Sequence, residues 1–316
     1  MDFKDYIGKE VHSIGIAGHV RPDGDCIGSC LATYLYIKDN FDVDVHVLME
    51  PIPHVFDFLT GSGEIVHEYD KSTVYDLFIS LDCSDKKRLG ETEVLYSNAA
   101  VKICIDHHKN NAMGADVTVV DEEASSTCEL VADFIGRENI TKEIAECIYT
   151  GIVTDTGVFQ YSCTHSSTME LAGFLMDKGI DYPWIVNHVF FEKHIKQQKL
   201  LGIAMDNATL VCDDRVIYSV ITKEDMARLS ASSKHLEGIS AQLRSTAGVS
   251  VSVFVQQNDN GSYKLSIRSD GAVDVAEVCQ LYGGGGHDRA AGATVNKPLD
   301  EFLPGLLKAI EHRLGE

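Results

Sequence analysis

The sequence predicts an α/β protein of two domains: an N-terminal domain with a mostly parallel sheet flanked by helices, a helical connector, and a smaller C-terminal α/β domain with a mixed sheet. Three observations support this fold class. The 316 residues are enough for two cores. Apolar runs of strand length alternate with segments of helical periodicity up to about residue 155. Repeated strand–helix units favour parallel strands joined by right-handed crossovers. The expected boundaries are 1–183, 184–206 and 207–316.

Five short apolar runs in the first domain are predicted to be buried strands. They are residues 14–17, 43–49, 77–81, 101–105 and 117–120. Apolar residues at helical spacing predict a first helix that begins near Gly28. Later helices are expected at residues 125–135, 142–154 and 166–178, and Gly179 is a typical stop for the last. Residues 184–205 contain few helix breakers, so we expect a helical connector there.

The second domain is expected to begin near Asn207. Its predicted strands are residues 208–211, 216–221, 249–256, 263–267 and 291–295. Its predicted helices are residues 235–244, 273–282 and 299–313. Strands and helices of this kind, in this order, indicate a smaller α/β domain with a mixed sheet.

Composition limits the classes of function. A hydrophobic content of 44% with 24% charged residues is ordinary for a globular protein. The net charge of −21 argues against a long nucleic-acid track, which needs a broad basic surface, but allows a short anionic substrate in a local pocket. Nine scattered cysteines without a Cys-x-x-Cys pair indicate reduced thiols. With no signal-peptide pattern and no apolar run near ~18 residues, we expect a cytoplasmic protein without membrane contact.

Acidic residues and histidines gather at four places in the first half of the chain. They are the segment His19–Asp25, Asp82, the segment Asp106–His108, and Asp155. The first three follow predicted strands, and polar residues at the carboxyl ends of neighbouring strands of an open sheet meet in one crevice. Oxygen and imidazole ligands without thiolate suit Mn²⁺ or Mg²⁺ better than a structural zinc.

The chemistry of these residues is that of a hydrolytic site with two metal ions. In an extended loop, Asp23 and Asp25 could reach two different ions, and Asp82 could bridge them. Two ions about 3.5–4 Å apart can hold a bridging hydroxide and a phosphoryl oxygen. Each cluster alone also has a structural explanation, because Asp-Gly after a strand is a common turn and a single Asp is a common helix cap. The combination, in this strand context, favours the metal site.

The four clusters resemble the motifs of the DHH phosphoesterase superfamily. The segment 19–29 (HVRPDGDCIGS) is similar to the branch of bifunctional oligoribonucleases (nanoRNases) and pAp phosphatases, whose relatives include phosphodiesterases of cyclic dinucleotides and pApA. The resemblance covers nearly the whole chain and implies two Mn²⁺ ions per chain, with Mg²⁺ or Co²⁺ as alternatives. It assigns His19, Asp23 and Asp82 to one ion and Asp25, Asp82, His107 and Asp155 to the other.

The same resemblance implies the remaining roles in catalysis. His108 is expected beside the phosphate as an electrostatic partner or proton donor, and Asp106 is expected to orient the imidazoles. A hydroxide that bridges both ions is the implied nucleophile. Arg88, six residues after Asp82, could stabilise phosphate charge, although an exposed loop arginine is an equal alternative. The sequence Ser125–Thr127 could bind phosphate at a helix N-terminus, but an N-cap is the better explanation.

A glycine-rich segment is the second strong signal, because consecutive glycines let a backbone approach a ligand closely. Gly283–Gly286 are followed by His287 and Arg289, which add side-chain donors. A flexible turn is the alternative. The segment resembles the GGGH signature of the DHH-associated C-terminal domain. That resemblance implies a set of substrate-binding residues, which comprises Arg268, Ser269, Gly284, Gly285, Gly286, His287 and, less firmly, Arg289.

The resemblance implies a Mn²⁺-dependent phosphodiesterase and phosphatase that hydrolyses short oligoribonucleotides and 3′-phosphoadenosine 5′-phosphate. Its partners would be mononucleotides to short oligonucleotides, bound in a cleft between the domains, and a homodimer is expected by analogy alone. The close alternative is hydrolysis of cyclic di-AMP or pApA. More distant alternatives are an inorganic pyrophosphatase and a nucleotide sensor without catalysis.

Overall fold

The computed structural model describes residues 2–315, and its chain divides into two compact units, Met1–Glu192 and Lys193–Glu316. Each unit is described by itself. The division falls inside residues 184–206, the range expected to form a connector. Helix α6 (Tyr182–Val186) and the π-helical turn Asn187–Phe191 lie in the first unit, and helix α7 (Ile195–Asp206) lies in the second.

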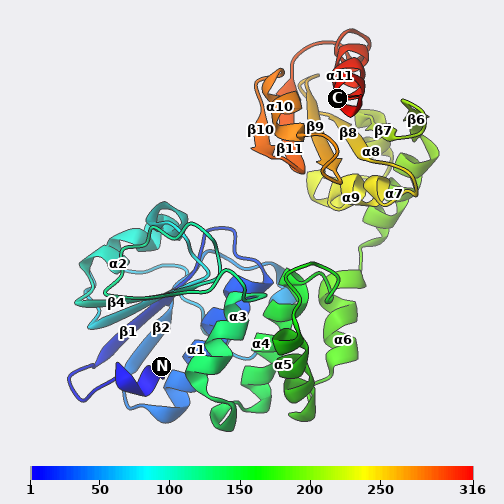
Figure 1. Ribbon diagram of the computed structural model, residues 1–316. Coiled ribbons are helices and arrows are strands. Elements are labelled where there is room, and N and C mark those ends of the chain that lie inside the picture. Colours follow the sequence, from blue (N-terminus) through cyan, green and yellow to red (C-terminus); the bar gives the residue numbers. More distant parts are fainter. Residues whose placement is uncertain (1, 316) are drawn as a thin grey trace. The chain divides into compact units, whose positions relative to one another are not determined.

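A five-stranded parallel sheet forms the centre of the first unit (Figure 1). Its strands are β1 (Ser13–Ala17), β2 (Asp44–Val47), β3 (Leu77–Leu81), β4 (Val101–Asp106) and β5 (Val117–Val120), and their order is β2-β1-β3-β4-β5. In register, Ile14 of β1 lies between Val45 of β2 and Leu77 of β3. The direction of strand order reverses at β1, and ligand sites of open α/β sheets lie beyond the carboxyl ends of the strands at such a point.

Helices cover both faces of this sheet. One core packs alternate strand residues, such as Ile16 and Ile79, against the larger helices of the unit. These helices are α1 (Gly24–Asn40), α3 (Thr127–Ile135), α4 (Lys142–Asp155) and α5 (Ser166–Asp177). The opposite face, which includes Phe78 and Cys104, packs with Leu95 and Tyr96 of the short helix α2 (Glu93–Asn98). Five 3₁₀ turns complete the unit at Phe3–Asp5, His54–Phe56, Ser62–Glu64, Lys86–Thr92 and Arg137–Asn139.

Two glycines let helices α1 and α4 approach each other closely. A Cβ added to Gly28 of α1 would lie 2.5 Å from the carbonyl oxygen of Cys147 in α4. A Cβ added to Gly151 of α4 would lie 2.9 Å from Oδ1 of Asp25 in α1. Contacts this short are not tolerated in close-packed interiors, so both positions need a residue without a side chain. The close approach brings the first turn of α1 near the last turn of α4, where Asp155 lies.

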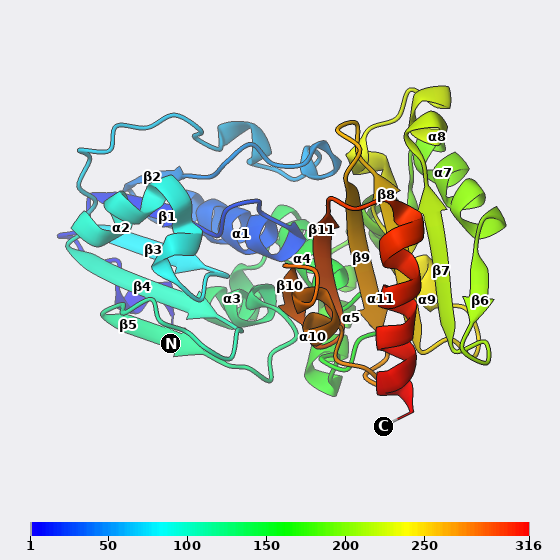
Figure 2. The ribbon, with the colours of Figure 1, turned by 90° about the horizontal axis from the view of Figure 1, so that it is seen from above.

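The second unit contains a mixed six-stranded sheet in the order β10-β11-β9-β8-β7-β6. Its strands are β6 (Thr209–Val211), β7 (Val216–Ile221), β8 (Val251–Gln257), β9 (Tyr263–Ser269), β10 (Gly285–His287) and β11 (Ala290–Val295). Strands β7 and β8 are parallel and the other pairs are antiparallel. Figure 2 shows these strands side by side, with helix α11 along one face. A core on that face joins Leu265 and Ile267 to Phe302 and Leu306 of α11.

The opposite face of the second sheet packs against α7 and α9, through Leu200, Leu243 and Phe254. The shorter helices of this unit are α8 (Lys223–Arg228), α9 (Ile239–Arg244) and α10 (Val275–Gln280), with a 3₁₀ turn at Ser233–Leu236 and the longer α11 at Leu299–Leu314. The predicted α/β class, with a parallel sheet followed by a mixed one, is therefore confirmed.

Three of the local predictions that differ from the structure bear on the polar sites or on the course of the chain. Helix α1 begins at Gly24 rather than near Gly28, because Asp23 caps it by accepting a hydrogen bond from the Cys26 amide. The expected helix at 235–244 is divided at Gly238, whose φ of 83° breaks it into a 3₁₀ turn and α9. Residues Gly285–His287, for which no strand was predicted, form the edge strand β10 opposite β11.

The cysteines match the expectation of free thiols. None of the nine is in a disulfide in the described part of the chain, and seven of them are buried. They behave as small apolar residues of the interior. Within residues 2–315, no helix has both the length and the apolar character needed to cross a membrane.

Candidate metal centre

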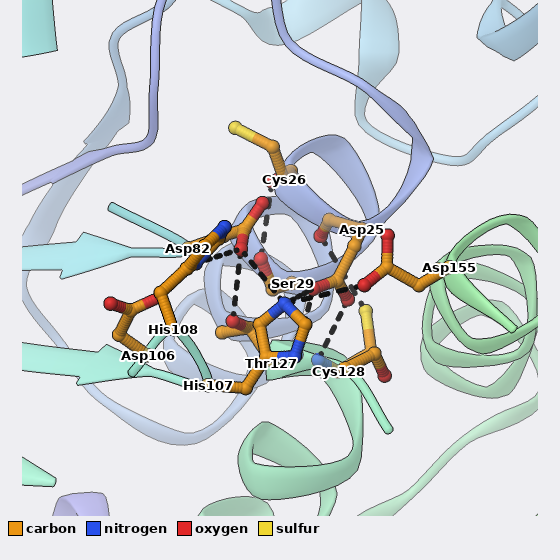
Figure 3. A network of polar contacts seen from close by, with 12 residues as sticks. Asp25, Cys26, Ser29, Asp82, Asp106, His107, His108, Thr127, Cys128 and Asp155 are labelled. Atoms are coloured by element: carbon orange, nitrogen blue, oxygen red, sulfur yellow. Dashed lines mark hydrogen bonds and ion pairs between the residues drawn. The ribbon is translucent and has the colours of Figure 1, made fainter. Parts of the chain in front are cut away.

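The polar clusters of the first unit lie at the carboxyl ends of three neighbouring strands. His19 follows β1 by two residues, Asp82 follows β3 directly, and Asp106 is the last residue of β4. These strands are adjacent in the order β1-β3-β4. Figure 3 shows that the side chains of Asp82 and His107, which follow β3 and β4, lie beside Asp25 at the start of α1 and Asp155 at the end of α4.

Asp82 lies at the middle of this arrangement. Its backbone is left-handed, with a φ of 53°, and its N–H donates to the carbonyl of Ile105 at 3.1 Å. Only a few per cent of residues other than glycine adopt this conformation, and aspartate is one of those that tolerate it. The residue is 2% exposed, and the hydroxyl of Thr127 donates to its Oδ1 at 3.2 Å. The strand end thus holds a buried carboxylate whose two oxygens face different neighbours.

His19 and Asp23 lie on one side of Asp82. Nε2 of His19 is 3.3 Å from Oδ2 of Asp82 and 3.6 Å from Oδ2 of Asp23. Nδ1 of His19 donates to the carbonyl of Val20 at 2.9 Å, which directs Nε2 toward the carboxylates as a metal-binding imidazole requires. Burial lowers the pKa of His19, but hydrogen bonds to Asp23 and Asp82 outweigh it and raise that pKa to about 11. A proton therefore neutralises the carboxylates on this side when no cation is bound.

His107, Asp25 and Asp155 lie on the other side of Asp82. Nε2 of His107 is 3.2 Å from Oδ2 of Asp155, 3.7 Å from Oδ1 of Asp82 and 4.0 Å from Oδ2 of Asp25. Burial, followed by the charges of Asp82 and Asp23, raises the pKa of Asp155 to about 7. One imidazole nitrogen thus faces three carboxylates, a concentration of negative charge that a divalent cation would relieve.

Asp25 is fully buried in the first turn of α1 and is held by the N-terminus of α3. Its Oδ2 accepts from the amide of Thr127 at 2.7 Å, and its Oδ1 accepts from the amide of Cys128 at 2.9 Å. Burial, and then the charges of Asp82 and Asp155, nevertheless raise its pKa well above the ordinary range. The two amides fix the orientation of this carboxylate before any ligand binds.

Asp106 and His108 form a hydrogen-bonded pair beside Asp82. Nδ1 of His108 is 2.7 Å from Oδ1 of Asp106 and 3.5 Å from Oδ1 of Asp82. The hydrogen bond to Asp106 is the main cause of the raised pKa of His108, and Asn111 holds the other oxygen of Asp106 at 2.8 Å. Asp106 is fully buried and belongs to none of the groups of possible ligands described below, so its hydrogen bond suits orientation of His108.

Three groups of side chains could each hold a cation. They are Asp25, His107 and Asp155; Asp82, His107 and His108; and His19, Cys26 and Asp82. Asp82 belongs to two of these groups, and apart from the Cys26 thiol the donors are carboxylates and imidazoles of the kind that bind Mn²⁺ or Mg²⁺. Burial, and then the neighbouring Cys30, raise the pKa of the Cys26 thiol well above its usual value, which makes this sulfur a poor ligand. The residues present therefore fit hard divalent ions.

The supporting residues were not found from the sequence. Thr127 and Cys128 bind Asp25 through backbone amides, so their side-chain types carry little signal. Asn111, which holds Asp106, lies five residues beyond it in a loop. Ser126 caps α3 by accepting from the amide of Glu129, which confirms the N-cap explanation for this segment. Arg88 lies in the 3₁₀ turn after β3, and its charge acts on His108.

The second unit holds a cavity of about 570 Å³ between β9, β11 and the glycine segment. Arg268, Gly284 and Gly285, three of the predicted substrate residues, line it together with Lys264 and Ser266. Lys264, Ser266 and Arg268 alternate along β9 and therefore share one face of the sheet. The cavity thus combines a cationic wall with an exposed glycine backbone.

Four other predicted residues are not among those that line this cavity. They are Ser269, Gly286, His287 and Arg289. Ser269 follows Arg268 on the strand, so its side chain points to the other face, where its hydroxyl accepts from the amides of Gly271 and Val273. The side chain of Arg289 lies 3.9 Å from that of Asp288 and over Gly271.

Comparisons with known proteins agree with the division of the chain into two units. The model of the DHH family, N-terminal domain, matches residues 13–152, and that of the DHHA1 domain matches residues 213–316. A Thermus thermophilus protein named bifunctional oligoribonuclease and PAP phosphatase NrnA is 29% identical over 95% of this chain and 90% of its own. The cyclic-di-AMP phosphodiesterase PdeA of Listeria monocytogenes is 26% identical over 94% of this chain and 47% of its own. The crystal structure of an exopolyphosphatase-related protein from Bacteroides fragilis has a TM-score of 0.86 and 28% identity, with 99% and 96% of the two chains covered.

Proposed function

Since the chain belongs to the DHH family and carries a DHHA1 domain after it, as its motifs predicted, we propose that it is a metal-dependent phosphoesterase of short oligoribonucleotides and 3′-phosphoadenosine 5′-phosphate. The observation that carries the proposal is the position of Asp82, a buried carboxylate shared by two groups of possible metal ligands. The relative from Thermus thermophilus, which is similar over nearly its full length, bears the name of both activities.

The proposed cofactors are two Mn²⁺ ions, with Mg²⁺ or Co²⁺ as alternatives. His19, Asp23 and Asp82 are proposed for one ion, and Asp25, Asp82, His107 and Asp155 for the other; the separations of their donor atoms support this grouping. When bound, such ions activate water as the nucleophile and neutralise phosphoryl charge. The chain itself supplies the shape of the site and the orientation of its ligands.

His108 is the proposed electrostatic partner or proton donor of the phosphoryl group. Its hydrogen bond to Asp106 raises its pKa, so that it carries a proton over a wider pH range and can donate it. Asp106, held in turn by Asn111, is proposed to orient the His108 ring. Arg88 is proposed to add positive charge on the same side.

The second unit is proposed to bind the nucleotide. Arg268, Gly284 and Gly285 line its cavity, where backbone amides, a guanidinium and Lys264 suit a phosphate or a ribose. His287, Gly286, Ser269 and Arg289 keep the role that the family resemblance implies, without support from the cavity. The net charge of −21 is compatible with this, because a local cavity needs no basic exterior.

A time course of products tests the proposed substrates. The protein with Mn²⁺ is incubated with 3′-phosphoadenosine 5′-phosphate, di- to pentaribonucleotides, pApA and cyclic di-AMP. Release of mononucleotide and of phosphate is expected, and the double variant Asp82→Asn, His107→Ala is expected to abolish both. Wild-type rates in that variant would show that the site is assigned wrongly.

Hydrolysis of cyclic di-AMP or pApA is the second candidate function. It is favoured by the similarity to the Listeria monocytogenes phosphodiesterase over 94% of this chain. This chain spans about half of that relative's length. The same time course separates the two, because a cyclic-dinucleotide enzyme would consume cyclic di-AMP faster than the linear trinucleotide.

A further inference from the structure

A cavity of about 190 Å³ in the first unit borders the candidate metal centre and has no role in the proposed function. We call it the side cavity. It is lined by His19 and Val20 after β1, by Leu48, Met49 and Glu50 after β2, and by side chains from two further loops. Those loops contribute His67 and Tyr69, and Leu89 and Glu91. His19 is thus common to the metal centre and the side cavity.

The walls of the side cavity are fixed by backbone hydrogen bonds. The amide of Val20 donates to the carbonyl of Arg88 at 2.7 Å, which ties the loop after β1 to the 3₁₀ turn Lys86–Thr92. The amide of Val66 donates to Val47 at 2.8 Å, which ties the loop of His67 and Tyr69 to the end of β2. The side cavity is therefore a preformed feature, as small-molecule sites usually are.

The polar groups of the side cavity are chiefly hydrogen-bond acceptors. Glu50 and Glu91 supply exposed carboxylates. Oε2 of Glu50 accepts from the amide of Arg21 at 2.9 Å, and Oε2 of Glu91 lies 3.3 Å from Nζ of Lys71, so the proposal uses Oε1 of each. Nδ1 of His67 lies 2.9 Å from the carbonyl of Met49 and donates to it, which leaves Nε2 as an acceptor in the neutral ring. Among the described residues that line the cavity there is no lysine or arginine. Apart from His19, which the side cavity shares with the metal centre, the lining suits a neutral group with hydroxyl or amino donors.

Tyr69 lines the side cavity together with the two carboxylates. Burial, and then the charges of Glu91 and Glu50, raise the pKa of its hydroxyl. The apolar parts of the lining, Val20, Leu48 and Leu89, form the rest of the wall. Acceptors opposite apolar side chains suit a group that has both hydroxyls and a carbon skeleton.

We propose that the side cavity binds the ribose of the nucleotide whose phosphate lies at the metal centre, with Glu50 and Glu91 accepting from its hydroxyls. A volume of about 190 Å³ is below that of whole-ligand pockets and suits one part of a ligand. An acidic residue near the end of the strand beside β1 accepts from ribose hydroxyls in dinucleotide-binding sheets, and Glu50 lies three residues beyond β2. The inference rests on the proposed function and deepens it, because it predicts selection for ribose over deoxyribose.

The test compares kcat/KM for pApA and for its 2′-deoxy counterpart, with Mn²⁺, in wild-type protein and in Glu50→Gln and Glu91→Gln. Bis(4-nitrophenyl) phosphate, which has no ribose, reports on the metal centre separately. We expect wild-type protein to favour the ribose substrate by about tenfold or more, the usual effect of a hydrogen bond to a charged group. In each variant the ratio should fall toward one, through loss on the ribose substrate. Glu68→Gln is the matched control, because Glu68 is exposed and does not line the cavity.

The possible outcomes distinguish failure of the ribose site from failure of the proposed function. A wild-type ratio near one, or a ratio that the two substitutions leave unchanged, would overturn the ribose site and leave the proposed function standing. Equal losses on all three substrates would also overturn it, because they would show damage to the metal centre. If the wild-type protein hydrolysed none of the three substrates, the proposed function would fail and the ribose site with it.

Discussion

The two units hold their polar groups in opposite ways. In the first unit, Asp25, Asp82 and Asp106 are at most 2% exposed and are surrounded by other charged groups. In the second unit, the proposed nucleotide site is an open cavity in which glycine backbone and cationic side chains are accessible. Buried carboxylates are costly unless a counter-charge is present, whereas an open cationic cavity is stable without a ligand. The first arrangement suits chemistry with metal ions, and the second suits binding.

This contrast predicts different kinetic effects for substitutions in the two units. Asp82→Asn should lower kcat by about a thousandfold, because metal ions supply several kcal/mol of transition-state stabilisation and ~1.4 kcal/mol corresponds to a factor of ten. Steady-state kinetics on a diribonucleotide with Mn²⁺ would measure it. Asp39→Asn, on the exposed end of α1, is the control with the same change of charge. A normal kcat with a raised KM in Asp82→Asn would contradict the assignment of chemistry to the first unit.

Asp106→Asn, in the same unit, should lower kcat less than Asp82→Asn does. Residues that orient metal-site groups typically contribute 10–100-fold, and we expect a loss of about that size in kcat. The pH profile should also shift, because the pKa of His108 falls when its main partner loses its charge. A loss of kcat without a change in the profile would argue that Asp106 serves the fold alone.

Arg268→Ala should raise KM by about tenfold and leave kcat within a fewfold, since one charged hydrogen-bond donor is lost from a binding cavity. Arg289→Ala tests the boundary of that cavity, because Arg289 does not line it. Equal effects of both substitutions would favour the wider set of substrate residues drawn from the family motif.

The pH dependence of stability should differ with and without metal. In the metal-free protein the pKa of Asp155 is raised to about 7 and that of His19 to about 11, so the folded state binds more protons than the unfolded state. Stability should therefore fall as pH rises from about 4 to 7, through Asp155, and fall further toward 11, through His19. Thermal unfolding should show Mn²⁺ raising the midpoint more at pH 8 than at pH 5. Equal stabilisation at both pH values would contradict competition between protons and metal.

The sequence predicted the convergence of the polar side chains in the first unit better than it predicted the lining of the cavity in the second. Strand ends are visible as apolar runs, so the convergence of His19, Asp82 and Asp106 could be foreseen. The position of Asp25 on a helix could not, because Asp23 starts α1 four residues before its apolar spacing begins. Close packing at Gly28 and Gly151 likewise depends on tertiary contact between α1 and α4.

The glycine segment shows the limits of a motif. Gly283–Gly286 were predicted to bind a ligand through their backbone, with a flexible turn as the alternative. The structure instead pairs Gly285 and Gly286 with β11 as an edge strand, and Gly283–Gly285 line the cavity. Ser269 was grouped with Arg268 because the pair resembles the Arg-Ser of the DHH-associated domain, and strand alternation places their side chains on opposite faces. The predicted strand ended at residue 267, whereas β9 ends at Ser269. With the correct end, strand alternation would have placed the side chains of Arg268 and Ser269 on opposite faces.

Titration of the metal-free protein with Mn²⁺, followed by calorimetry, tests the shared role of Asp82 most directly. The account predicts two ions per chain for the wild-type protein and loss of tight binding at both positions in Asp82→Asn. A single ion in the wild-type protein, or two ions bound equally well by the variant, would contradict it.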